Sequence, residues 1–349
     1  MLCCEAPFSV HNVLEFAPRP TGRKPVRRRE FMTLVGGAAA SWPFGARAQE
    51  AGRTYRLGCL FPTPRDAPVN IALFDELRRS GFIEGQNLTI DWRQYLPRID
   101  LIPELAAELV KAQVDVIVAV GDLAIRAVQR ATATIPILGS TDDMVGSGLV
   151  NSLGHPGGNT TGTSIFATEL DGKRQEILIE AVPGLRRMAA LADSNTTTDA
   201  NLHALQEAAR ARNIELSIHR IARPEEIAAA IDAAKASGAA ALNVLSAPIL
   251  FNSRQIIMQR VAALGLPAIY QFPEEAGEGG FVAYGPRIVQ MFRELVAPQC
   301  VKLLRGVKPA DIPVEQPTKF DLVINRTTAK ALGISFPQTL LATADEVIE

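Results

Sequence analysis

The feature that most restricts the fold is a regular alternation, from Tyr55 onward, of short apolar runs with longer amphipathic segments. The runs are rich in valine, isoleucine and leucine, as buried strands are. In the segments between them, apolar residues recur every three or four positions, as they do along one face of a helix. Strands that alternate with helices are typical of a parallel sheet covered by helices on both faces. The sequence therefore predicts an α/β fold.

The alternation occurs in two series of similar layout. The first predicts strands at residues 56–61, 88–92, 114–120 and 135–139, and helices at 69–80, 101–112 and 123–131. A glycine-rich passage, residues 155–166, separates it from the second. That series predicts helices at 169–182, 199–212, 225–237 and 253–264, and strands at 188–192, 215–221, 240–245, 267–270 and 280–284. Two such series predict two doubly wound, Rossmann-like lobes with a cleft between them.

The remaining segment predicts a long helix at 288–305, a strand at 320–324 and a helix at 327–332. We expect an N-terminal lobe at 54–163, a C-terminal lobe at 164–285, and a return segment at 286–349. The return segment is expected to cross back and pack on both lobes. The lobes would then be joined by several strands, which form a hinge rather than a loose linker.

Residues 1–48 are predicted to be a leader and export signal. Arg28 and Arg29 form a twin-arginine pair, about a dozen apolar or small residues follow, and residues 46–48 read Ala-Arg-Ala. The run is shorter than the roughly 20 residues that span a bilayer. This pattern predicts a periplasmic protein cleaved near Ala48, although an arginine-rich tail before a buried helix is the alternative. Residues 1–25 are long for such a leader, which indicates a mis-assigned start with Val26 as the initiator.

Charge and cysteine content exclude some functions. Residues 1–48 hold seven of the 36 lysines and arginines and three of the 37 acidic residues, so the remainder carries 29 against 34, a net charge of −5. A mildly acidic body argues against nucleic acid, which selects basic patches. Cys59 and Cys300 are the cysteines of this remainder. The periplasm permits a disulfide between them, but we favour two free buried thiols.

Motifs for catalysis or cofactor binding are not found. The histidines of the mature chain, His155, His203 and His219, lack metal-ligand spacing. The sequence has no GxSxG motif, and the nearest approach to a dinucleotide fingerprint, at 146–151, ends in asparagine without a clear strand before it. We therefore expect no metal, no cofactor and no enzyme activity. An exported cofactor-dependent enzyme and a ligand-sensing receptor module remain the alternatives.

Binding of a small molecule at the strand ends is the remaining possibility. Ligands of open α/β sheets bind beyond the carboxyl ends of the strands. The loops at those ends are rich in polar residues, although any single one can serve only as a helix cap or turn. The candidate ligand-binding residues are Thr63, Asp66, Asp122, Thr141, Asp142, Asp143, Asp193, Asn195 and Ser246, with Tyr284 as a flat apolar wall.

Several strings resemble the ABC-transporter substrate-binding proteins of the tryptophan/tyrosine-binding-like group. They include DELRRSGFIEGQNLTIDWR (75–93), GLVNSLGHPGGNTTG (148–162), LDGKRQEIL (170–178) and the run from Ile312 to Glu349. The resemblance implies a type-1 periplasmic binding protein fold with a ligand in the cleft. It also implies no catalysis, and delivery of the ligand to a permease and its ATPase. A monomer is expected.

The sequence departs from the family pattern at the cleft. Gly121-Asp122-Leu123 replaces a Gly-Gly-Thr-Pro-like turn, and Ala192-Asp193-Ser194 replaces Trp-Asn-Pro, which removes an aromatic platform. The aspartates at 122, 142, 143 and 193 predict an acidic cleft. An amino acid or another amine-bearing solute would suit it through charge-assisted hydrogen bonds, with Asp143 as the expected partner of the cation.

Overall fold

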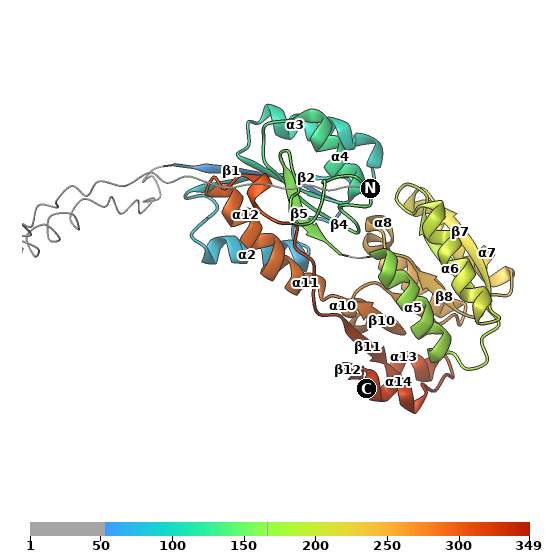
Figure 1. The fold of residues 1–349 in the computed structure, drawn as a ribbon. Helices are drawn as coiled ribbons and strands as arrows, with labels where there is room; N and C mark the ends of the chain where they lie inside the picture. Colours follow the sequence, from blue (N-terminus) through green and yellow to red (C-terminus); the bar gives the residue numbers. More distant parts are fainter. Residues whose placement is uncertain (1–52, 166) are drawn as a thin grey trace, which may run out of the picture. The chain divides into compact units, whose positions relative to one another are not determined.

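The first lobe is built on a parallel sheet of five strands (Figure 1). The computed structural model describes residues 53–165 and 167–349, so the predicted signal and start site lie outside the described residues. The strands lie in the order β2-β1-β3-β4-β5. Their bounds are β1 (Tyr55–Phe61), β2 (Leu88–Gln94), β3 (Val116–Val120), β4 (Ile137–Thr141) and β5 (Thr160–Ser164).

Helices cover both faces of this sheet and enclose a separate apolar cluster on each. One face carries η1 (Ile99–Leu101), α3 (Ile102–Lys111) and α4 (Asp122–Ala131). The other carries α2 (Pro68–Arg79), α11 (Ile288–Met291), the π-helical turn η3 (Phe292–Val296) and α12 (Ala297–Leu304). The last three form the helix predicted at 288–305. The π turn lies next to Pro298, which has no N–H for the regular helical bond.

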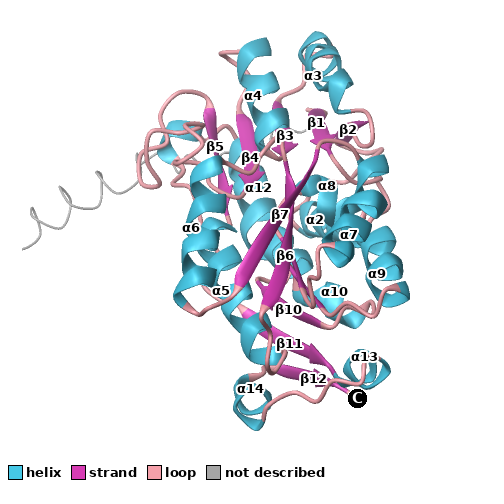
Figure 2. Cartoon of the chain, turned by 90° about the vertical axis from the view of Figure 1, so that its right-hand side faces the viewer, coloured by secondary structure: helices cyan, strands magenta, loops and turns pink. Residues whose placement is uncertain are grey.

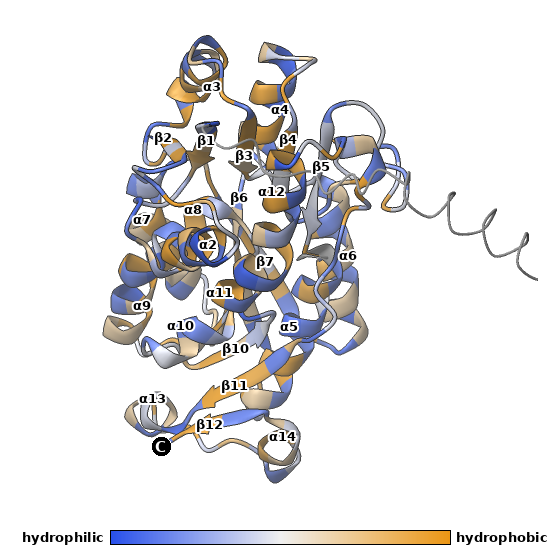
Figure 3. Cartoon of the chain, turned by 90° about the vertical axis from the view of Figure 1, so that its left-hand side faces the viewer, coloured by the Kyte–Doolittle hydropathy of each residue, from blue (hydrophilic) through white to orange (hydrophobic). Residues whose placement is uncertain are grey.

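The second lobe contains a sheet of seven strands in the order β12-β11-β10-β9-β8-β6-β7. Strands β6 to β10 are parallel to one another, whereas β11 and β12 are parallel to each other and run antiparallel to the rest. Figure 3 shows β11 as markedly hydrophobic, as a strand inside a sheet should be. Their bounds are β6 (Arg187–Asp193), β7 (Glu215–Ile221), β8 (Leu242–Val244), β9 (Ala268–Tyr270), β10 (Val282–Gly285), β11 (Asp321–Asn325) and β12 (Glu346–Ile348).

Two further apolar clusters fill the faces of the second sheet. Figure 2 shows β6 and β7 with α5 and α6 on one side and α7 and α9 on the other. The first side carries α5 (Ala167–Ala181), α6 (Asp199–Ala211) and α14 (Gln338–Thr343), with α13 (Arg326–Ala331) against β12. The second carries η2 (Pro224–Glu226), α7 (Ile227–Ala236), α8 (Pro248–Asn252), α9 (Arg254–Ala263) and α10 (Pro273–Gly277). The predicted two-lobed α/β architecture is confirmed.

The chain passes between the lobes after β5, after β10 and before β11 (Figure 1). Residues 286–349 therefore divide between the lobes. Helices α11 and α12 pack on α2 in the first lobe, whereas β11 and β12 join the sheet of the second. The returning segment, which includes η4 (Pro309–Asp311), also pairs with β5, because Ser164 N donates to Glu315 O at 2.9 Å and Glu315 N donates to Gly162 O at 2.9 Å.

The sequence patterns did not predict β5. Its sequence, TTGTS, contains no large apolar residue, although every residue of the strand is buried. Gly162 is required there because a Cβ at this position would lie 1.8 Å from Gly139 O on the neighbouring strand. The short elements α8, α10, α14 and β12 were also missed, since segments of three to six residues carry too few positions to define a period.

Cys59 and Cys300 are free and buried, and both belong to the apolar cluster under α2 and α12. Burial raises the pKa of the Cys300 thiol to about 12 and also raises the pKa of the Cys59 thiol. The structure thus has the two free buried thiols that we favoured over a disulfide. No helix within the described residues is long and apolar enough to cross a bilayer.

Candidate functional site

Two adjoining pockets lie between the lobes. The apolar pocket has a volume of about 60 Å³, and the loops after β1, β3, β4, β8 and β9 contribute to it together with α11 and η3. Its apolar lining includes Phe61, Val69, Phe251, Phe272 and Phe292. The polar pocket has a volume of about 520 Å³ and lies between α4 with the loop after β4 in one lobe, and α5 with the loop after β6 in the other. Thr141, Asp142, Ser246 and Pro248 line both pockets.

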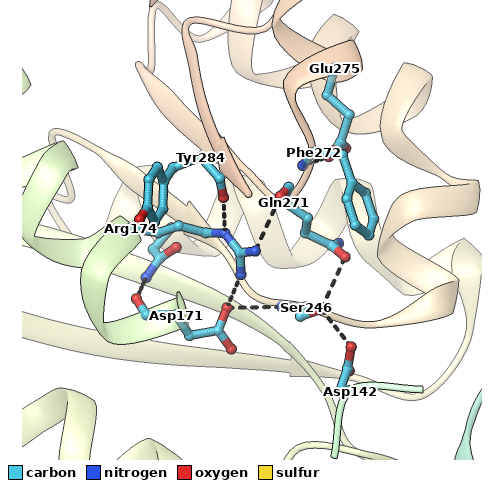
Figure 4. Close-up of polar contacts among 9 residues, drawn as sticks. Asp142, Asp171, Arg174, Ser246, Gln271, Phe272, Glu275 and Tyr284 are labelled. Carbon is cyan, nitrogen blue, oxygen red and sulfur yellow. Dashed lines mark hydrogen bonds and ion pairs between the residues drawn. The ribbon is translucent and has the colours of Figure 1, made fainter. Parts of the chain in front are cut away.

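A buried arginine organises the second-lobe side of both pockets (Figure 4). Arg174 of α5 is fully buried, and Nη1 donates to Asp171 Oδ1 at 2.7 Å. Its Nε donates to Tyr284 O at 2.8 Å and its Nη2 donates to Gln271 O at 3.1 Å. Asp171 Oδ1 also accepts from Ser246 N at 3.2 Å. One side chain therefore fixes the ends of β9 and β10 and, through Asp171, the loop after β8.

A hydroxyl connects the two lobes at the boundary between the pockets. Ser246 Oγ of the second lobe lies 2.9 Å from Asp142 Oδ1 of the first lobe and 3.2 Å from Gln271 Oε1 (Figure 4). A hydroxyl has one hydrogen, so it donates to one of these oxygens at a time. The other contact needs either a protonated Asp142 that donates to Ser246, or a Gln271 amide turned to donate through its NH2 group. The proton on Asp142 and the orientation of Gln271 are therefore coupled.

Two buried amides in the apolar pocket each leave one atom without a partner. Asn70 is 0% exposed; its Nδ2 donates to Thr63 Oγ1 and Pro64 O, and its Oδ1 has no partner. Gln271 is 1% exposed and its Nε2 has no partner. Leaving a buried polar group unpaired costs about 1–3 kcal/mol. Unpaired amides from both lobes in one pocket are therefore suited to a ligand that contacts both.

Burial and neighbouring charges shift the pKa of two aspartates at this site. Burial, reinforced by the negative charge of Asp122, raises the pKa of Asp142 to about 7, against the opposing hydrogen bond from Ser246. Burial raises the pKa of Asp171 to about 6, although the Arg174 guanidinium opposes the shift. Asp142 therefore carries a proton for part of the time near neutral pH, in agreement with its role in the hydrogen bonds of Ser246.

The structure brings seven of the sequence-predicted residues to the pockets. Thr63, Thr141, Asp142 and Ser246 line the apolar pocket. Asp122, Asp143 and Asn195 line the polar pocket, together with Thr141, Asp142 and Ser246. Asp122 is the first residue of α4 and accepts a hydrogen bond from Thr141 Oγ1.

The two adjacent aspartates at the end of β4 have different partners. Asp143 Oδ1 accepts from Val145 N at 3.1 Å and from Gly146 N at 2.8 Å, so this carboxylate caps its own turn. Gly146 leaves room for this carboxylate, because a Cβ on it would lie 2.0 Å from Asp143 Oδ2. Asp142 instead contacts the opposite lobe. The geometry therefore favours Asp142 over Asp143 as a ligand contact.

Three predicted residues line neither pocket. Asp193 is 4% exposed and accepts from Asn195 N at 2.9 Å, which makes it a turn cap. Asp66 is exposed in the loop after β1. Tyr284 packs against apolar clusters of both lobes at the crossing after β10, with its ring 6.3 Å from that of Phe320. The aromatic side chains that line the apolar pocket are phenylalanines.

Sequence reasoning missed several residues of the site. Asn70 was included in a predicted helix, although it is a polar residue in the buried first turn of α2, directly after a strand-end loop. Asp171 and Arg174 were noticed only within a family string, although their spacing places them on one helix face. Phe251 lies in α8, which the patterns did not predict. For Asn70, the available signal was a polar residue in the first turn of a predicted helix that follows a strand-end loop.

The geometry does not suggest a metal centre. Among the described residues, no group of three or more histidine, cysteine, aspartate or glutamate side chains could hold a metal ion. Two lobes joined by a hinge, with strand-end loops of both converging on pockets between them, instead define the class of bilobal ligand-binding proteins.

The chain belongs to the ABC transporter substrate-binding protein family, whose model matches residues 69–348. It is 25% identical over 263 residues to the tyrosine-binding protein of Clostridioides difficile (strain R20291), which covers 74% of each chain.

Two solved structures share the fold. A conserved domain protein from Vibrio cholerae has a TM-score of 0.77 at 23% identity, covering 84% of this chain and 100% of the other. An ABC domain from Streptococcus pneumonia, solved in complex with L-Trp, has a TM-score of 0.75 at 23% identity with the same coverage. The matching family model confirms the predicted family, and with it the function of binding a transported solute.

Proposed function

We propose that this protein is the periplasmic solute-binding component of an ABC importer, and that it holds a small molecule in the apolar pocket between its lobes. The open form binds at one lobe, the other lobe adds its contacts on hinge closure, and water is excluded. The protein then delivers the solute to the permease and ATPase subunits in the inner membrane. It acts as a monomer and turns nothing over.

The unpaired atoms of Asn70 and Gln271 are the observation that carries this proposal. They come from different lobes and line the same pocket, so a bound solute satisfies both only when the lobes are close together. Such an arrangement couples binding to closure. With a volume of about 60 Å³ in this conformation, the pocket has room for a few water molecules, so solute entry requires the lobes to open.

The solute is proposed to be an amino acid or another amine-bearing molecule. The related proteins bind tyrosine and L-Trp, as their names state. The aspartates around the cleft favour a solute with an amino group. A hydrogen bond between an ammonium group and a carboxylate contributes about 1.5–3 kcal/mol, against about 1 kcal/mol for a neutral hydrogen bond.

A thermal-shift screen of the purified protein against amino acids, amines and other small solutes tests this function. A solute at 100 times its Kd should stabilise the protein by about 2.7 kcal/mol. Stabilisation by no solute in a broad collection, with the fold intact, would contradict the proposal.

Export through the twin-arginine route is the second part of the proposal. Replacing Arg28 and Arg29 by lysine should leave the precursor in the cytoplasm, measured by fractionation and immunoblotting. Mature protein isolated from the periplasm should begin near Gln49. Normal export of the double lysine variant would exclude the twin-arginine route and leave the general secretory route.

A further inference from the structure

Three side chains of the apolar pocket, Asn70, Asp142 and Gln271, can offer hydrogen-bond acceptors at once. Asn70 Nδ2 donates to Pro64 O at 2.7 Å, and a backbone carbonyl can only accept, so Asn70 Oδ1 is the atom that remains free. When Asp142 is ionised, Ser246 donates its one hydrogen to Asp142. If the Gln271 amide then turns from its orientation in the structure, where Oε1 faces Ser246 and Nε2 is unpaired, Nε2 donates to Ser246 and Oε1 becomes the free atom. With Asp142 ionised, the pocket can therefore offer acceptors from both lobes.

Positive charge for a ligand carboxylate is absent from the pocket lining. None of the residues that line the apolar pocket is a lysine or an arginine. The nearby Arg174 is fully buried, and its nitrogens donate to Asp171, Tyr284 O and Gln271 O. It lies in the second lobe, and each of its three nitrogens already has a hydrogen-bond partner in the protein.

The first-lobe wall is also unfavourable for a carboxylate. The N-terminus of an α-helix would normally attract an anion. In this chain α4 begins with Asp122, whose own carboxylate lies at that end and accepts from Thr141 Oγ1. Asp142 lies at the end of the next strand. An incoming carboxylate would meet the negative charges of Asp122 and of ionised Asp142 at this wall.

We propose that the solute is a compact aromatic amine that has no carboxylate, with its ammonium group bound by Asp142 and Asn70 and its ring packed among the phenylalanines of the apolar pocket. This inference rests on the proposed function, since it concerns the same cleft, and it narrows the solute to a class that excludes free amino acids. Gln271 Oε1 contributes a third acceptor from the opposite lobe on closure.

Matched pairs of probes test the carboxylate directly. Tryptamine is compared with L-tryptophan, tyramine with L-tyrosine, and benzylamine with benzoate, by thermal shift and calorimetry at pH 7.5. We expect the amine in at least one pair to bind about tenfold or more tightly than its carboxylate partner. Tighter binding of the carboxylate member, or binding of neither member in any pair, overturns this inference. Stabilisation by another solute in the broad screen would leave the proposed function standing in either case.

The adjacent aspartates provide matched variants. Asp142→Asn removes the charge and keeps the shape of the side chain, so affinity for the amine should fall about tenfold or more. Asp143→Asn changes a neighbouring carboxylate that lines only the polar pocket, and should leave affinity within about twofold. Equal losses in the two variants would show a general effect of charge in the cleft and would contradict a direct contact.

Proton release gives a readout that a structural role of Asp142 would not produce. An ammonium group that binds ionised Asp142 lowers its pKa, so binding near pH 6 should release a proton. Three other charged groups act on Asp142, namely Asp122 of α4 and Asp171 and Arg174 of α5. Calorimetry in buffers of different ionisation enthalpy measures the release. It should approach one proton in the wild type and disappear in Asp142→Asn, whereas no release in the wild type would contradict the contact.

Discussion

The two pockets share a boundary and differ in how their polar groups are satisfied. Carboxylates of the polar pocket are largely occupied by the protein itself: Asp143 caps its own turn, Asp122 accepts from Thr141, and Asp171 accepts from Arg174 and Ser246. The apolar pocket is small and lined by phenylalanines, yet it contains unpaired atoms of two buried amides. An abundance of charge is therefore a weaker sign of a binding site than one or two buried groups without partners.

The largest expected effect concerns Arg174, whose hydrogen bonds hold the second-lobe side of both pockets. Arg174→Met leaves Asp171 buried without its partner and releases two carbonyls, so the free energy of unfolding should fall by about 3–5 kcal/mol. Arg212→Met is the control. Arg212, at the end of α6, pairs at the surface with Glu176 of α5, the helix that carries Arg174, and this pair should contribute less than about 1 kcal/mol. Urea denaturation measures both. Similar small losses would show that the buried network does not hold the pocket walls.

The second test concerns the boundary residue and depends on pH. Because the folded protein raises the pKa of Asp142 from 3.8 to about 7, protonated Asp142 favours the folded state. This contribution is complete below about pH 4 and is lost as pH rises toward 7, with a slope of at most about 1.4 kcal/mol per pH unit.

Asp142→Asn cannot ionise, so the stability of the wild type relative to this variant should fall across that window. Asp171 and Glu275 also have pKa values raised by burial, but both proteins contain them. The difference in stability between the wild type and the variant therefore reports on Asp142. Chemical denaturation at intervals from pH 4 to 8 measures it. A constant difference would mean that Asp142 titrates in the same range folded and unfolded.

The smallest expected effect sharpens the contrast between the adjacent aspartates. Asp143→Ala removes the cap on the Val145 and Gly146 amides, so stability should fall by about 1 kcal/mol. Affinity for the solute should change little, because this carboxylate does not line the apolar pocket. Thermal unfolding and calorimetry of one preparation check both statements. A large loss of affinity with little loss of stability would move the ligand contact to the polar pocket.

Much of the fold could be predicted because it depends on local periodicity. The alternating runs predicted the main strands and helices of both lobes. Strand β5 could not be predicted in this way, since its burial is determined by Gly139 on the neighbouring strand and by the segment around Glu315. A sequence pattern shows what each residue prefers by itself, whereas this strand is defined by its neighbours.

The site was predictable only at the level of loops. The strand-end rule indicated the edges of both sheets that line the two pockets, and the acidic residues there were visible in the sequence. It could not distinguish Asp142 from Asp143. That difference depends on Gly146, which admits one carboxylate to its own turn, and on Ser246 in the opposite lobe, which pairs with the other. Asn70 could not be predicted as a ligand contact, because the sequence does not show that its side chain is buried or that its Oδ1 has no partner.

A crystal structure with the tightest-binding amine from the matched pairs tests the central claim most directly. The account predicts closed lobes, with the ring among Phe61, Phe251 and Phe272 and the ammonium within hydrogen-bond distance of Asp142 and Asn70 Oδ1. It also predicts that Gln271 Oε1 faces the ligand. Density for the amine in the polar pocket, beside Asp143 and Asn195, with the apolar pocket unchanged, would contradict the account.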